Sequence, residues 1–152
     1  MQESNFEGKF NGSIQNIIKA SFNYVNNNAK EVELIYVFGA IGDGDFAFNV
    51  FYKINGRLAK TNRVNTISTQ QYDISDQKVL GLLDEGTNIL QNIDALYSEN
   101  GKKTPTDIKI IYDTKTEKFE TKMGYDQRYY VKGHKTVTQV FNDWFVEMGG
   151  KL

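Results

Sequence analysis

The sequence contains no cysteine, one proline and one histidine in 152 residues. Without cysteine, the chain has no disulfide framework and no thiolate nucleophile, and every zinc or iron–sulfur site with a cysteine ligand is excluded. A single histidine also excludes zinc hydrolase sites, because these need two histidines at helical spacing. The sequence therefore predicts neither a metal nor a cofactor.

Long apolar runs and a strong net charge are also missing. The apolar runs LIYVF and VFY are far shorter than the roughly 20 residues of a membrane-spanning helix. The opening MQESNFEGKFNGS has no apolar segment typical of a secretory signal. We therefore expect a cytoplasmic protein that does not enter a membrane. The net charge of −1 provides no overall field to attract nucleic acid, so direct nucleic-acid binding is not expected.

Charge is unevenly distributed along the chain. Residues 1–100 carry 8 basic and 12 acidic groups, whereas residues 101–135 carry 9 basic and 5 acidic groups. The two segments thus have net charges of −4 and +4. The simplest interpretation is ordinary solvated surface charge, and a functional division is the alternative.

Hydrophobic periodicity predicts three amphipathic helices. Apolar residues recur at spacings of three and four from Phe10 to Val25. Ser75 is a candidate N-cap for a long helix that ends near Gly101, with Gly86 on its apolar stripe for close packing. Thr136 is similarly a candidate N-cap for a last helix, and Gly149 and Gly150 end that helix.

Alternating and continuous apolar patterns predict about five strands, at 32–38, 46–54, 57–66, 108–113 and 119–125. One face of the first should hold Val32, Leu34, Tyr36 and Phe38, and its other face is apolar too, which indicates a central strand. The Asn55-Gly56 pair is a strong signal for a hairpin that joins the second and third strands. The expected fold is a single α+β domain over 1–152, of order α-β-β-β-α-β-β-α, whose mostly antiparallel sheet is packed by amphipathic helices.

The GDGD stretch around Asp43 and Asp45 could bind a metal or turn the chain. Gly42 and Gly44 tolerate the backbone of a tight turn, and both aspartates can bond their own backbone. A calcium loop would need more oxygen ligands, but apolar residues follow from Phe46. The pattern therefore favours a turn.

No motif for catalysis stands out. There is no G-x-S-x-G elbow, phosphate-binding loop or dinucleotide fingerprint. An enzyme would have to use His134 as a general base with a carboxylate, and a surface position is the simpler interpretation of a histidine in a Gly/Lys loop. The tyrosines and cations of YDQRYYVKGHK (125–135) suit nucleic-acid stacking or a protein interface, but tyrosines that cover a sheet edge beside solvated cations are the simpler interpretation.

The segment YSENGKKTPTDIKIIYDTKTEKFETKMGYDQ resembles the YezG-type bacterial antitoxin and immunity family, as does FNVFYKINGRL before it. The matching features are Asn100-Gly101, the Pro105-Thr106 step, the TKTE turn and the pair Tyr125-Asp126. The resemblance implies a non-catalytic protein that binds a cognate secreted toxin, often a nuclease, and blocks it. An unrelated protein-interaction domain is the alternative.

An immunity protein of this kind needs carboxylates that face the cationic, nucleic-acid-binding cleft of the toxin. The expected partner-binding residues are Asp43, Asp45, Asp73, Asp76, Asp84, Glu85, Tyr125 and Asp126. Asp43 and Asp45 rank first, because a protruding turn can enter a cleft.

Overall fold

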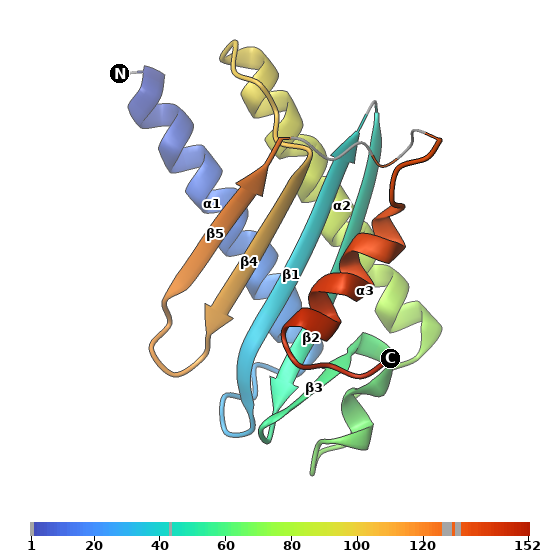
Figure 1. Ribbon diagram of the computed structural model, residues 1–152. Coiled ribbons are helices and arrows are strands. Elements are labelled where there is room, and N and C mark those ends of the chain that lie inside the picture. The colour runs from blue at the N-terminus through green and yellow to red at the C-terminus, as the bar shows by residue number, and fades with distance from the viewer. Residues whose placement is uncertain (1, 43, 126–128, 130–131) are drawn as a thin grey trace.

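A computed structural model describes residues 2–42, 44–125, 129 and 132–152. The elements follow the predicted order α-β-β-β-α-β-β-α, with one short 3₁₀ helix in addition (Figure 1). They are α1 (Gln2–Tyr24), β1 (Val32–Gly42), β2 (Asp45–Ile54), β3 (Arg57–Lys60), η1 (Thr61–Thr66), α2 (Asp76–Glu99), β4 (Asp107–Asp113), β5 (Phe119–Gly124) and α3 (Val137–Glu147). The α+β prediction is confirmed.

The five strands form one antiparallel sheet in the order β3-β2-β1-β4-β5. β1 is central, as its two apolar faces predict. The β2–β3 hairpin turns at Asn55 and Gly56, whose φ values of 51° and 78° are those of a type I′ turn. β5 lies at the sheet edge and exposes Glu120 and Lys122 to water, as its polar face predicts.

The sheet is covered on both faces. α1 and α2 pack on one face, and α3 crosses the other (Figure 1). β1 supplies both cores, because Ile35 and Val37 face α1 and α2 whereas Tyr36 and Phe38 face α3. Among the described helices, none is long and apolar enough to cross a membrane.

Three details differ from the sequence-based expectation. α1 begins eight residues before Phe10, at Gln2, and Phe6 packs edge-on against Tyr97 with ring centroids 4.9 Å apart. A register shift between Val32 and Leu34 places Val32 in the core under α1 and α2, so its predicted face was wrong. The third strand ends at Lys60 instead of residue 66, because the chain turns into η1 and buries Val64.

Gly86 allows α2 to lie close against β2. A Cβ atom added at Gly86 would overlap the ring of Phe48, whereas one added at Gly81, on the solvent side of the same helix, would meet nothing within 4 Å. The close packing predicted for Gly86 is confirmed.

Replacement of Gly86 with alanine should therefore destabilise the fold by about 2 kcal/mol, because overpacking outweighs the better helix propensity of alanine. Gly81→Ala is the matched control and should stabilise it by up to about 1 kcal/mol. Urea unfolding of both variants measures the difference. Equal effects of the two substitutions would contradict the close approach of α2 to β2.

Candidate functional site: an acidic stripe on α2 and a basic groove beside α3

The start of α2 uses two of the predicted carboxylates for local structure. Ser75 caps the helix by accepting a hydrogen bond from the backbone N–H of Lys78 at 3.2 Å. Asp73 in turn accepts from the backbone N–H of Ser75 at 3.0 Å, and hydrogen bonds from Ser75 lower the pKa of Asp73. Asp76 lies in the first turn, where the helix dipole favours a negative charge.

Asp76, Leu80 and Asp84 lie on one side of α2, because residues four apart share a helix face. We call these three residues the acidic stripe. All are exposed, and the Leu80 side chain is unusually so for its type, at 57%. Neither of the two ion pairs in the described residues involves α2. The stripe therefore presents two carboxylates and an apolar side chain to solvent.

The other predicted residues are dispersed. Asp73 and Glu85 line a shallow groove between α1 and α2. Asp45 starts β2 at the end of the sheet farthest from the start of α2, and Tyr125 follows β5 at that same end (Figure 1). Asp43 and Asp126 lie outside the described residues. The predicted residues that are described thus do not form one continuous surface.

His134 is exposed in the connection between β5 and α3. Tyr129 anchors this connection by donating a hydrogen bond to Asp107 Oδ2 at 2.8 Å. His134 itself makes no hydrogen bond or ion pair within the described part of the chain. Among the residues that the structure describes, no carboxylate is bonded to it as the orienting partner of a general base would be. The described residues also contain no cluster of three or more His, Asp or Glu side chains that could hold a metal ion.

Glu31 is a buried carboxylate that the sequence analysis did not single out. It accepts hydrogen bonds from Ser68 Oγ, from Thr69 N (3.0 Å) and Oγ1 (2.8 Å), and from Tyr72 OH (2.6 Å). Burial opposes its ionisation, but the hydrogen bonds from Ser68, Tyr72 and Thr69 outweigh burial and lower the pKa of Glu31 to about 2. The cluster ties the segment between η1 and α2 to the start of β1, which is a structural role.

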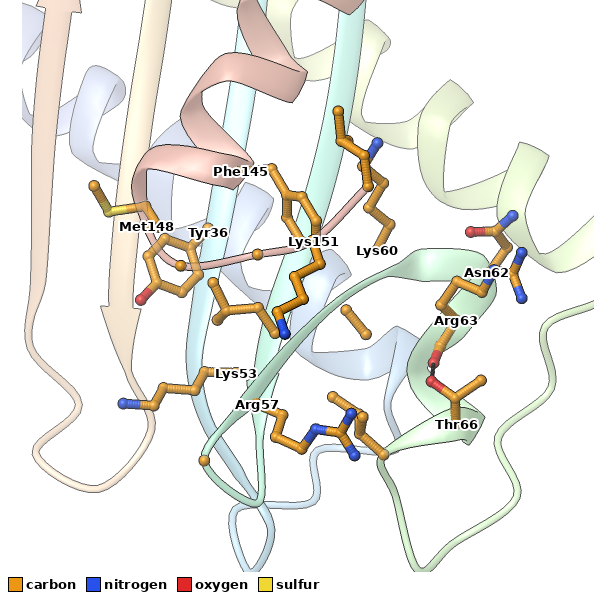
Figure 2. A pocket seen from close by; sticks show the side chains of 17 residues that line it. Tyr36, Lys53, Arg57, Lys60, Asn62, Arg63, Thr66, Phe145, Met148 and Lys151 are labelled. Atoms are coloured by element: carbon orange, nitrogen blue, oxygen red, sulfur yellow. Dashed lines mark hydrogen bonds between the residues drawn. The ribbon is translucent and has the colours of Figure 1, made fainter.

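A basic groove lies between the end of α3 and the segment formed by β3 and η1 (Figure 2). Its volume is about 850 Å³. The cationic side chains that line it are Lys53, Arg57, Lys60, Arg63 and Lys151, and no carboxylate side chain is among its described lining residues. Apolar residues, including Leu58, Phe145 and Met148, lie between the cations. The groove can therefore attract negatively charged groups and also bury apolar ones.

Three of the five cations are free to meet a ligand. Lys60 donates to Asn142 Oδ1, and its Nζ lies 5.2 Å from the centroid of the Phe145 ring. Burial lowers the pKa of Lys60. Lys53 pairs with Glu33 at 3.9 Å. Arg57, Arg63 and Lys151 are exposed, and within the described residues their side chains have no hydrogen-bond or ion-pair partner.

The end of α3 directs Lys151 toward this groove. Gly149 has a φ of 111°, and the backbone N–H of Gly150 donates to the carbonyl of Phe145 at 2.9 Å, as in a Schellman motif. A Cβ atom added at Gly150 would overlap the ring of Phe145. The two glycines thus fold the tail back across Phe145, so that Lys151 faces the β2–β3 hairpin (Figure 2).

The sequence signal for the groove is the stretch KINGRLAKTNR, which carries four cations between Lys53 and Arg63. The stretch lies within residues 1–100, whose net charge is negative, so the net charge of that long segment does not reveal the local excess of cations. Only the hairpin and the packing of α3 bring Lys151 to the same place.

The residues of the YezG-type resemblance shape the fold. Gly101, with a φ of 63°, follows the C-cap of α2, and Thr106 hydrogen-bonds Gly124 at the start of the β4–β5 pair. They therefore point to an architecture more than to a binding surface. No protein-family model matches the chain, and no curated protein matches it in sequence.

Proposed function

We propose that this chain is a cytoplasmic immunity protein that binds a cognate secreted bacterial toxin, a nuclease, and covers its active site without catalysing a reaction. The observation that carries the proposal is the acidic stripe on α2, formed by Asp76, Leu80 and Asp84. A nuclease binds the phosphate backbone through cations, and exposed carboxylates are complementary to such a cleft.

The stripe is held on a rigid support. α2 is packed on the sheet at Gly86 against Phe48 and at Leu90 against Gly39, where an added Cβ would lie 2.7 Å from the Leu90 side chain. A preformed surface loses little conformational entropy on binding. Leu80, between the two carboxylates, would contribute roughly 2 kcal/mol if an interface buried it completely.

Reversing both charges of the stripe tests the proposal. Candidate nuclease toxins, beginning with any that is encoded beside this gene, are expressed in a bacterial host with and without the chain. The wild-type chain should protect the cells, and Asp76→Lys with Asp84→Lys should weaken the purified complex about a hundredfold in low salt, because carboxylates are replaced by cations that the cleft repels. Isothermal titration calorimetry measures the affinity.

Glu7→Lys with Glu120→Lys is the matched control, because both residues are exposed, neither belongs to the acidic stripe, and the two substitutions change the net charge equally; Glu7 follows Phe6, which packs at the opposite end of α2 from the stripe. The control should bind as the wild type does. The proposal is wrong if the wild-type chain neither protects the cells nor binds any of these nucleases. If it binds but the stripe variant retains full affinity, the contact lies elsewhere.

A further inference from the structure

We propose that the basic groove is a second binding site, which takes an extended acidic segment of a protein. It lies at the β3 edge of the sheet, beside the end of α3, and no residue of the acidic stripe lines it; Asp76 and Leu80 line a neighbouring pocket that shares Lys60 and Asn62 with the groove. The proposal therefore does not depend on the acidic stripe.

The first step is the unbalanced charge of the groove. Within the described residues, the side chains of Arg57, Arg63 and Lys151 have no carboxylate partner, and no Asp or Glu side chain lines the groove. Unpaired cations around one concave surface raise the local concentration of anionic ligands. Arginine also binds carboxylates through two parallel hydrogen bonds, which adds geometric specificity. The ligand should therefore be anionic.

The second step is the spacing of the cations. Figure 2 shows Lys53 at one end of the groove, Arg63 near the other end, and Arg57 and Lys151 between them. A single compact anion, such as inorganic phosphate, is held best by donors that converge on one point. The side chains here are instead distributed along the groove. They match a ligand that carries several separate negative charges.

The third step distinguishes a peptide from a nucleic acid, which are both extended polyanions. Single-stranded nucleic acid is bound largely by stacking of its bases on aromatic faces. The aromatic side chains that line this groove, Tyr36 and Phe145, are only 6% and 3% exposed, so neither offers a free face. Leu58 and Met148 are half-buried and can accept apolar side chains. An acidic peptide with interspersed apolar residues fits this lining better.

The fourth step is that the groove is preformed. The type I′ turn at Asn55 and Gly56 sets the position of Arg57, and Gly56 N–H donates to Glu33 Oε1 at 2.7 Å. The opposite wall is α3, whose N-terminus has a capping box between Thr136 and Gln139. Little ordering of the protein is thus needed for a ligand to bind.

Fluorescence anisotropy with a short labelled peptide of alternating glutamate, leucine and serine tests the proposal. The same peptide with glutamine in place of glutamate, a labelled oligothymidylate and inorganic phosphate are compared. The glutamate peptide should bind, with an affinity that falls as salt rises. Arg57→Glu with Arg63→Glu should weaken that binding by tenfold or more, and the milder Arg57→Gln with Arg63→Gln should weaken it less.

Lys9→Glu with Lys19→Glu on the exposed side of α1 changes the net charge equally and should leave peptide binding unchanged. Circular dichroism establishes that each variant is folded. Equal binding of the glutamate and glutamine peptides, or an equal loss in the α1 variant, would overturn the proposal. Tighter binding of the oligonucleotide or of phosphate than of the glutamate peptide would also overturn it. So would a dimer in sedimentation that Arg57→Glu with Arg63→Glu abolishes, because a second copy would then occupy the groove.

Discussion

Replacing Glu31 with alanine is expected to lower the free energy of unfolding by roughly 3 kcal/mol, because several neutral donors around it lose a charged acceptor at once. Glu31 is 6% exposed, and its carboxylate accepts hydrogen bonds from three side-chain hydroxyls, one backbone N–H and the side-chain amide of Asn55. Without it, the hydroxyl of the buried Tyr72 and the hydroxyl of the half-buried Ser68 lose this acceptor. The segment between η1 and α2 should then detach from β1. Urea unfolding at neutral pH measures the loss.

The same cluster predicts how stability depends on pH. The pKa of Glu31 is lowered from 4.5 to about 2, so the folded state favours the ionised carboxylate. Its contribution to the free energy of unfolding is present above pH 4.5 and is lost as the pH falls toward 2.

Unfolding measured across that pH range should show the stability difference between wild type and Glu31→Gln shrinking as the solution becomes more acid. Glu7→Gln, an exposed control, should behave like the wild type at every pH. A difference between wild type and Glu31→Gln that stays constant down to pH 2 would show that Glu31 does not carry this acid sensitivity.

Replacing Trp144 with alanine is expected to cost about 4 kcal/mol and to loosen α3 selectively. Trp144 is 4% exposed and packs on the sheet, with its ring centroid 5.1 Å from that of Phe51 and 5.8 Å from that of Tyr36. α3 has 11 residues, which is too short for a stable isolated helix in water. Its stability must therefore come from this apolar contact.

Hydrogen exchange should show the amides of α3 losing protection in Trp144→Ala while those of α1 and α2 keep theirs. The basic groove should lose the glutamate peptide as well, because Phe145 on α3 and Lys151 in the tail after α3 both line it. Val146→Ala is the control on the same helix: Val146 is 48% exposed, and the change should stay within about 0.5 kcal/mol. Uniform loss of protection across the whole fold would show that α3 does not open independently of α1 and α2.

The features that the sequence predicted correctly depend on residues that lie close together in the chain. Asn55-Gly56 sets a hairpin because both residues adopt left-handed φ, and Ser75 and Thr136 cap helices through bonds to residues three positions away. The apolar period placed the strands and helices, since burial follows the side-chain spacing of each element. The close approach at Gly86 was foreseeable because it lies on the apolar stripe of α2.

What the sequence alone determined was thus the order, type and buried faces of the elements, because these depend on residues a few positions apart. The tertiary structure decided that Val32 shifts register, that Ser68, Thr69 and Tyr72 converge on Glu31, and that Lys151 meets Arg57 and Arg63 in one groove. It also dispersed the predicted carboxylates between two ends of the molecule. Such contacts join residues tens of positions apart, and only the packing of the sheet and helices sets which of them meet.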